Sequence, residues 1–267
     1  MLDWNPALYR RFEDERTRPA QELLARVPLA AKASDTGAAQ ATHVVDLGCG
    51  PGNSTELLVQ RFPQAQVTGI DTSKAMLASA RARLPGTAFE QGDIATWVPK
   101  VAPNLIYANA ALQWVAGHDT LVPRLFSLLA PGGVLAIQMP DNRQEPSHRL
   151  MRDIAGQSPW REPIGDADRV RTELATIGGY YDMLAPQAAQ VDVWHTVYQH
   201  VMPTAGAIVD WLRSTGLRPF LDPLGDELRA SFLAEYERRI GEAYPQRSDG
   251  NRLLSFPRMF IVAQRPA

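Results

Sequence analysis

The chain has 267 residues and a formal charge of −2, with 45% hydrophobic and 21% charged residues, as expected for a globular protein with a sizeable core. The small net charge provides no basic field for nucleic acid or anionic lipid, and the single cysteine, Cys49, excludes an internal disulfide framework. No stretch approaches about 18 consecutive apolar residues. We therefore expect a cytoplasmic protein that binds neither nucleic acid nor membrane.

The N-terminal region is predicted to be helical. Apolar residues recur at helical spacing over residues 5–28, and Pro19 is predicted to start a second helix, because proline is tolerated in a first helical turn. The small and polar residues at 30–41 indicate a loose connector before the main body of the chain.

Short apolar runs alternate with helical stretches from residue 43 onward. The pattern predicts strands at 43–47, 66–71, 87–93, 104–110 and 134–140, and helices at 54–62, 73–84 and 119–130. Asn53 or Ser54 is expected to cap the first of these helices, and Ser73 the second. Alternation at this spacing is typical of an α/β protein whose parallel sheet has helices on both faces.

The rhythm of the sequence changes after residue 141. Helices are predicted within 145–156, 180–187, 207–217 and 226–244, and late strands at 191–202 and 258–265. Residues 203–257 therefore insert helices between two strands. No repeat or long linker marks a second independent domain.

The first predicted strand runs into the sequence VVDLGCGPGNS, in which glycines occupy alternate positions: Gly48, Gly50 and Gly52. The backbone N–H groups of such a turn, with the start of the following helix, suit a nucleotide-like ligand. The dinucleotide fingerprint G-x-G-x-x-G does not fit, because Asn53 stands at its third glycine and Asp46 would repel a pyrophosphate.

Acidic residues end three consecutive predicted strands, at Asp46, Asp71 and Asp93. The carboxylate of Asp71 can accept both hydroxyls of a ribose, and Asp93 can accept from the amino group of adenine. Strand-end aspartates also cap helices, so only the three acids together favour a ligand. They describe a ligand with a ribose, an amino-bearing base and a positive group but no phosphate, which S-adenosylmethionine fits.

These residues resemble the first motif of the class I S-adenosylmethionine-dependent methyltransferases, an acid followed by G-x-G-x-G, and the resemblance covers about residues 43–140. Other segments resemble the trans-aconitate 2-methyltransferase family: 3–27, 109–118, 138–153, 208–221 and 256–265. The resemblance implies a Rossmann-like, doubly wound, mostly parallel seven-stranded sheet whose last strand is antiparallel. It also implies methylation of a carboxylate of trans-aconitate, which gives the monomethyl ester and S-adenosylhomocysteine.

The same resemblance implies a single methyltransferase domain over residues 1–267. Within it we expect four regions, namely an N-terminal helical lid, a cofactor-binding core, substrate-side helices with a strand over the acceptor pocket, and a closing strand: 1–29, 43–140, 141–257 and 258–265.

A carboxylate acceptor is ionised at neutral pH and needs no general base, so we expect neither a catalytic dyad nor a metal. His195 and His200 do not suggest a metal pair, because their odd spacing on one strand points them to opposite sides. The enzyme must instead hold the reacting oxygen in line with the methyl group and exclude water. A lid, an aromatic wall and arginine forks are the parts that this chemistry needs.

Candidate residues exist for each of these parts. The expected cofactor-binding residues are Trp4, Tyr9, Asp46, Gly48, Gly50, Asn53, Ser54, Asp71, Thr72, Ser73, Met76, Gly92, Asp93, Ile94, Asn109, Ala110 and Trp114. The expected substrate-binding residues are Arg16, His118, Tyr180, Tyr181, Trp211, Arg213, Arg218 and Arg258. Cys49 is interpreted as a small turn residue and not as a nucleophile, since the nearby Asp46 disfavours a thiolate.

Alternative interpretations remain open at this stage. Trp114 can instead belong to the core, His118 can simply begin a helix, and the arginines can be solvated surface residues. A methyltransferase for another small-molecule acceptor is the alternative enzyme, whereas the full set of cofactor acids disfavours the other alternative, a cofactor-binding protein without catalysis. We expect a monomer or a weak homodimer.

Overall fold

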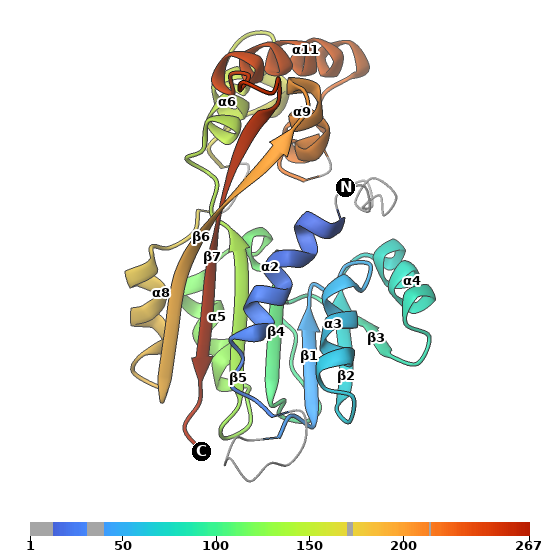
Figure 1. The fold of residues 1–267 in the computed structure, drawn as a ribbon, viewed down its shortest axis with the longest axis vertical. Coiled ribbons are helices and arrows are strands. Elements are labelled where there is room, and N and C mark those ends of the chain that lie inside the picture. The colour runs from blue at the N-terminus through green and yellow to red at the C-terminus, as the bar shows by residue number, and fades with distance from the viewer. Residues whose placement is uncertain (1–12, 31–39, 170–172, 214) are drawn as a thin grey trace. The chain divides into compact units, whose positions relative to one another are not determined.

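The computed structural model describes residues 13–30, 40–169, 173–213 and 215–267. Within these residues, seven strands form one sheet in the order β3-β2-β1-β4-β5-β7-β6 (Figure 1). The strands are β1 His43–Leu47, β2 Gln66–Asp71, β3 Ala88–Gln91, β4 Leu105–Asn109, β5 Val134–Pro140, β6 Gln190–Met202 and β7 Arg252–Gln264.

The sheet is parallel except for its last strand in chain order. β1 pairs in parallel with both β2 and β4, and β3 and β5 continue the parallel sheet on either side. β7 lies between β5 and β6 in the strand order, and its arrow in Figure 1 runs opposite to that of β6. The predicted Rossmann-like, mostly parallel sheet with an antiparallel last strand is confirmed.

Helices connect the strands, as the alternating pattern predicted. The helical elements within the described residues are α2 Glu13–Ala25, α3 Asn53–Arg61, α4 Lys74–Arg83, η1 Leu112–Trp114, α5 His118–Ser127, α6 Pro146–Ala155, α7 Arg161–Ile164, α8 Ile177–Leu184, α9 Ala205–Arg213, α10 Arg218–Leu221 and α11 Asp226–Ala243.

The chain divides into two compact units. The sheet unit holds the described residues of Asp3–Met139, Leu174–His195 and Met259–Ala267. The helical unit holds those of Pro140–Glu173 and Thr196–Arg258. The prediction that residues 1–267 form a single domain stays a prediction.

The core of the sheet unit lies along its central strands. The residues of β4 from Leu105 to Ala108 and those of β5 from Val134 to Met139 are all buried, which is typical of parallel strands covered on both faces. α5 packs its apolar side, including Leu121 and Phe126, into this core. In the helical unit, α11 packs against α6 and α9, and the hydroxyl of its buried Tyr236 donates to the Ser147 carbonyl at 2.9 Å.

Three local predictions were wrong in detail. Pro19 lies inside α2 and does not start it, although proline removes a backbone hydrogen bond there; Ala20 and Leu23 of the same helix are buried. Gly52, in the left-handed conformation, precedes α3 in place of an Asn53 or Ser54 cap. β7 begins at Arg252, six residues before the predicted start, so Arg258 lies within the strand.

Other predictions are confirmed. β1, β2 and β5 have the predicted bounds, and Ser73 caps α4 by accepting a hydrogen bond from the Met76 N–H at 3.2 Å. The part of the expected lid that the structure describes is packed: the Ala20 carbonyl of α2 accepts from the buried Tyr107 hydroxyl at 2.6 Å. Residues 1–12 of that lid lie outside the described residues.

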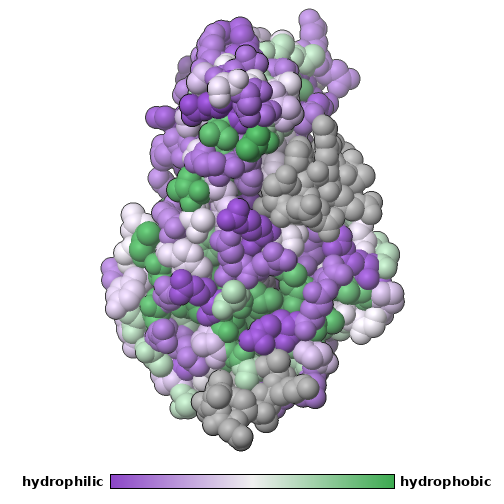
Figure 2. Space-filling model, in the orientation of Figure 1, coloured by the Kyte–Doolittle hydropathy of each residue, from purple (hydrophilic) through white to green (hydrophobic). Residues whose placement is uncertain are grey.

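The described surface is mixed. On the face shown in Figure 2, hydrophilic residues are interspersed with smaller apolar areas. The large apolar side chains that the structure exposes are Val98, Val101, Trp114, Ile177, Tyr181, Val197 and Val201. Among the described helices, none combines the length and apolar character that crossing a membrane would require.

Candidate active site

The glycine turn after β1 is tied to the end of β2. The N–H groups of Gly48 and Cys49 donate to the Ile70 carbonyl at 2.7 and 3.0 Å. A Cβ on Gly48 would come within 2.3 Å of the Ala111 Cβ, so glycine is required there for close packing. Gly50 also has a positive φ, but a Cβ there would meet nothing within 4 Å. The turn therefore packs tightly at Gly48 and leaves open space at Gly50.

Asp71, at the end of β2, holds two backbone segments together. Its Oδ2 accepts from the Gly50 N–H at 2.9 Å, and its Oδ1 accepts from the Ser73 N–H at 2.8 Å. Asp71 thus positions the glycine turn, and its role in binding a ribose stays a prediction.

Asp46, at the end of β1, is fully buried. Its Oδ2 accepts from the Ser54 hydroxyl at 2.9 Å and from the Thr55 hydroxyl at 2.6 Å, which fixes the first turn of α3. Burial raises the pKa of Asp46 to about 6, although the two hydroxyl donors act in the opposite direction. Its Oδ1 has no hydrogen-bond partner within the described part of the chain.

The loop after β3 carries the third acid. Asp93 is exposed, and its Oδ1 accepts from the Ala95 N–H at 2.9 Å. Arg124 of α5 fixes this loop by donating to the Ile94 carbonyl at 2.6 Å and the Trp97 carbonyl at 2.8 Å. Sequence reasoning missed Arg124, because it lies 27 and 30 residues from these partners and belongs to no local motif.

The loop after β4 is the fourth part of the site. Ala110 has a φ of 53°, and its N–H donates to the Gln138 carbonyl of β5 at 2.9 Å. The side-chain amide of Gln113 donates to the Ala110 carbonyl at 2.7 Å. Trp114 is 37% exposed, so the alternative that it is a core residue was wrong.

These features fit S-adenosylmethionine. Asp46 Oδ1, Asn109 Oδ1 and Gln113 Oε1 are buried acceptors without a hydrogen-bond partner among the described residues. Asp46 and Asn109 lie at the ends of the neighbouring strands β1 and β4, and Gln113 lies in η1, shortly after β4. Buried acceptors are seldom left unsatisfied, which indicates a ligand with donors or positive charge. The ammonium and sulfonium of S-adenosylmethionine meet that need, and Gly50 leaves room for approach.

The other expected cofactor residues lie in the same four loops or next to them. Met76 and Ile94 are buried, Thr72 is exposed, and Gly92 donates its N–H to the Asp71 carbonyl at 3.1 Å. Two of the expected cofactor residues, Trp4 and Tyr9, lie outside the described residues.

Cys49 is buried inside the glycine turn. Burial raises the pKa of its thiol far above the usual range, and the charges of Asp46 and Asp71 add to this effect. The thiol therefore stays protonated at neutral pH, which supports its interpretation as a packed turn residue.

The expected substrate residues of the sheet unit are mostly buried. His118 Nε2 lies 2.9 Å from the Leu112 carbonyl, which can only accept, so this nitrogen carries the proton. His118 Nδ1 then accepts from the Tyr180 hydroxyl at 2.6 Å. Both ring nitrogens are engaged, and Tyr180 lies in the core and not at the mouth of a pocket as we expected. Tyr181 is 50% exposed, and the side chain of Arg16 lies outside the described part.

The remaining substrate candidates belong to the helical unit. Trp211 is buried, with its ring centroid 4.6 Å from that of His200 and 5.9 Å from that of Phe256. Arg258 is also buried, and its guanidinium lies over the rings of Phe256 and Tyr198 at 4.9 and 5.9 Å from their centroids. These side chains form one aromatic cluster.

Two further candidates, Arg213 at the end of α9 and Arg218 at the start of α10, are exposed and half-buried respectively. The expected substrate residues are therefore divided between the two units.

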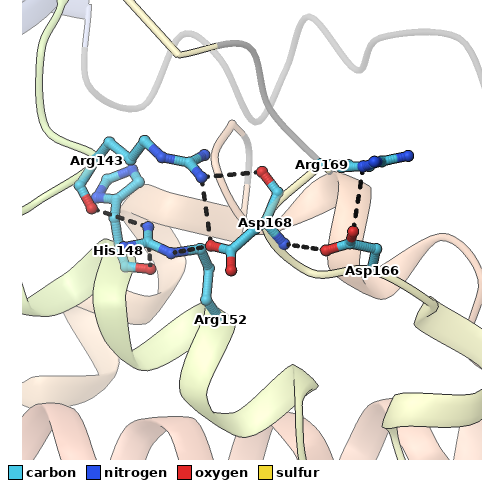
Figure 3. A network of polar contacts seen from close by, with 6 residues as sticks. All are labelled: Arg143, His148, Arg152, Asp166, Asp168 and Arg169. Atoms are coloured by element: carbon cyan, nitrogen blue, oxygen red, sulfur yellow. Dashed lines mark hydrogen bonds and ion pairs between the residues drawn. The ribbon is translucent and has the colours of Figure 1, made fainter.

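The helical unit also contains an arginine network that the sequence analysis did not single out (Figure 3). Arg143 Nη2 and Arg152 Nε contact the same oxygen, Asp168 Oδ1, at 3.3 and 3.2 Å. Arg152 also donates to the Arg143 carbonyl at 2.9 Å, and burial together with the Arg143 charge lowers its pKa. The three residues are 9 to 25 positions apart, and no local pattern signals their pairing.

Comparisons with known proteins show what the chain is similar to. A family described as Methyltransferase domain matches residues 44–133, which include the glycine turn and all three acids. The YcgJ protein from Bacillus subtilis, a solved structure, superposes with a TM-score of 0.56 at 14% identity, covering 94% of this chain and 99% of that one, and it shows the fold alone.

Curated relatives match over the whole length of the chain. The protein named Trans-aconitate 2-methyltransferase in Variovorax paradoxus (strain S110) is 69% identical over 268 residues, covering 100% of both chains. Its namesake in Paracidovorax citrulli (strain AAC00-1) is 69% identical over 269 residues with the same coverage. At this identity and coverage, the chain belongs to the trans-aconitate 2-methyltransferase family.

Proposed function

We propose that this chain transfers a methyl group from S-adenosylmethionine to a carboxylate of trans-aconitate, giving the monomethyl ester and S-adenosylhomocysteine. The observation that carries the proposal is the 69% identity, over the whole chain, to relatives of that name. Asp46 Oδ1 at the end of β1 and Asn109 Oδ1 at the end of β4 are buried acceptors that no described residue donates to, which supports a positively charged cofactor at this edge of the sheet.

The residues of the chain would hold and orient the cofactor and the acceptor, and none is needed to remove a proton from the acceptor. When bound, S-adenosylmethionine supplies a methyl group made electrophilic by its sulfonium. Asp71, the glycine turn and the loop of Asp93 would hold its nucleoside, and the loop from Asn109 to Trp114 would flank its amino acid end. A carboxylate acceptor with a pKa near 4 is already ionised at neutral pH.

No general base is proposed, and the structure supports this view at His118. Its Nδ1 accepts from the Tyr180 hydroxyl and its Nε2 donates to a backbone carbonyl, so neither nitrogen is available to an acceptor hydroxyl. A rate that is flat with pH near neutrality is expected, whereas a base-dependent acceptor would give a bell-shaped profile.

Arginine forks remain our proposal for the acceptor. Arg16, Arg213, Arg218 and Arg258 are the candidates, because a planar guanidinium pairs with a carboxylate through two parallel hydrogen bonds. The single cysteine fits a reducing compartment and the formal charge of −2 provides no basic field, so we propose a cytoplasmic protein without nucleic-acid partners, as a monomer or a weak homodimer.

The test is a methylation assay with S-adenosylmethionine labelled in its methyl group. Purified protein is incubated with trans-aconitate, cis-aconitate, isocitrate and citrate, and the products are identified by mass spectrometry. We expect the highest kcat/KM on trans-aconitate, with a base-labile methyl ester as the product. Turnover of another acceptor while trans-aconitate stays unlabelled would overturn the substrate but not the cofactor.

A further inference from the structure

Gln113 is a polar residue that is almost completely buried. It lies in η1, directly after β4, and only 4% of it is exposed. Its Nε2 donates to the Ala110 carbonyl at 2.7 Å. Since a carbonyl only accepts, this contact fixes which end of the side-chain amide is nitrogen and which is oxygen. The orientation of Oε1 therefore follows from a contact within the chain.

The residue that Gln113 holds is conformationally unusual. Ala110 is the one residue other than glycine with a positive φ among those described, at 53°. Left-handed backbone is disfavoured for residues with a Cβ and persists where the surroundings determine it. Ala110 is held through its N–H, which donates to the Gln138 carbonyl, and through its carbonyl by Gln113. This turn brings Ala111 against Gly48 of the glycine turn.

The oxygen end of the amide lacks a hydrogen-bond donor among the described residues. Gln113 Oε1 is buried and has no hydrogen-bond partner within the described residues. Asn109 Oδ1, at the end of β4, and Asp46 Oδ1, at the end of β1, likewise have no hydrogen-bond partner within the described residues. An ionised tricarboxylate offers only acceptors to this position. The donors of S-adenosylmethionine are its ribose hydroxyls and its adenine amino group, which are assigned above to Asp71 and Asp93, and its ammonium. The ammonium is therefore the donor left for Gln113 Oε1.

We propose that Gln113 binds the amino group of the cofactor. Its Nε2 holds the left-handed turn at Ala110, and its Oε1 accepts a hydrogen bond from the ammonium of the methionine part. The inference rests on the proposed function, because it takes S-adenosylmethionine as the cofactor, but it does not depend on which acid is methylated.

The test compares two ligands that differ in this amino acid part. S-adenosylhomocysteine carries the ammonium, whereas 5′-methylthioadenosine keeps the nucleoside and sulfur but lacks it. Calorimetry on the full chain with the Gln113→Leu variant should show an affinity for S-adenosylhomocysteine about 10-fold lower, as for loss of one hydrogen bond to a charged group. Affinity for 5′-methylthioadenosine should change by less than about twofold.

Two more variants separate binding from turn geometry. Ala110→Gly removes the cost of the positive φ, so a Gln113→Leu/Ala110→Gly protein regains the turn but not the acceptor. Its affinity for S-adenosylhomocysteine should stay low. Gln113→Glu loses the donor to the Ala110 carbonyl, as Gln113→Leu does, but it keeps an acceptor oxygen and adds negative charge. Its preference for S-adenosylhomocysteine over 5′-methylthioadenosine should therefore match or exceed that of the wild type.

Gln264→Leu is the matched control, because Gln264 also donates its amide to a backbone carbonyl, that of Gly132 at 3.2 Å. It should bind both ligands as the wild type does. An equal loss for both ligands in Gln113→Leu, or full recovery with Ala110→Gly, would overturn the proposal. If Gln113→Leu does not fold, as judged by Tm, the ligand preference of Gln113→Glu decides: a preference below that of the wild type overturns the proposal. These binding experiments contain no acceptor acid, so their result can be interpreted even if trans-aconitate proves not to be the substrate.

Discussion

Two carboxylates, one in each unit, organise their surroundings in different ways. Asp71 of the sheet unit accepts from two backbone N–H groups, at Gly50 and Ser73, that lie within 21 residues of it. Asp168 of the helical unit is shared by two arginine side chains, and its own side chain is 75% exposed. The Asp71 carboxylate is fixed by backbone groups in two turns, the one after β1 and the one before α4. The Asp168 carboxylate depends on long, flexible side chains whose pairing is screened by water.

At these two places, therefore, the sheet unit relies on hydrogen bonds to the backbone and the helical unit on ion pairs between side chains. At the carboxyl edge of the sheet, a substitution that changes the backbone should therefore be costly. In the arginine network, a comparable loss of charge should be tolerated.

The contrast is sharpest at Gly48. An alanine there would place its Cβ 2.3 Å from the Ala111 Cβ at a φ of +70°, so Gly48→Ala should lower the free energy of unfolding by about 3 kcal/mol or more. Urea unfolding followed by circular dichroism measures the change.

Gly50→Ala is the matched control for this prediction. Its added Cβ meets nothing within 4 Å, so it should cost only about 1 kcal/mol for the positive φ while weakening S-adenosylhomocysteine binding. Ala111→Gly removes the clashing methyl group and should recover part of the stability of Gly48→Ala. Equal stability of the Gly48 and Gly50 variants would contradict the packing argument.

Asp46 should make stability depend on pH. Its folded pKa is raised to about 6 from 3.8, so the folded state holds this proton more tightly than the unfolded chain. The resulting stabilisation is present below pH 3.8 and is lost as the pH rises through 6, by about 3 kcal/mol in total. Asp46→Asn lacks this loss.

Urea unfolding from pH 4 to pH 7 checks the effect as a double difference. The free energy of unfolding of wild type relative to Asp46→Asn should fall across that range, which isolates this carboxyl from all other titrating groups. A constant difference between the two proteins would show that Asp46 keeps an ordinary pKa in the folded state.

The sequence predicted the sheet unit well because its signals are local. Asp46, Asp71 and Asp93 each end an apolar run, and the parallel sheet then brings strand ends to one edge. Gly52 before α3 was missed, since a left-handed turn can replace a side-chain cap. For the candidate site, the sequence did not predict contacts between residues that are far apart along the chain.

Side chains that act over long sequence distances carried no such signal. Tyr180 was expected at the mouth of a pocket, yet it donates to His118, 62 residues away, within the core. Arg124 and the pairing of Arg143 with Asp168 were missed for the same reason. The residue type alone does not show whether a tyrosine or arginine lies in the core, binds a ligand or is solvated at the surface. Only tertiary packing distinguishes these three cases.

Arg124 tests whether a side chain can matter in the sheet unit when it acts on backbone. Arg124→Ala removes both donors to the loop of Ile94 and Trp97, so the KM for S-adenosylmethionine should rise about 10-fold while kcat changes little. Arg265→Ala is the control, since Arg265 similarly donates to the Ser127 and Leu129 carbonyls, outside the cofactor loops. Steady-state kinetics that gave the same KM for both variants would exclude a positioning role.

The smallest effect is expected in the arginine network of the helical unit. Asp168→Asn keeps the shape of the side chain but removes the charge that Arg143 and Arg152 share. Because Asp168 is 75% exposed, the free energy of unfolding should fall by less than about 1 kcal/mol, and the deficit should shrink in 0.5 M salt. Thermal unfolding at low and high ionic strength measures both. A loss as large as that of Gly48→Ala would contradict the contrast between backbone-built and side-chain-built regions, because an exposed carboxylate would then stabilise as much as a packed turn.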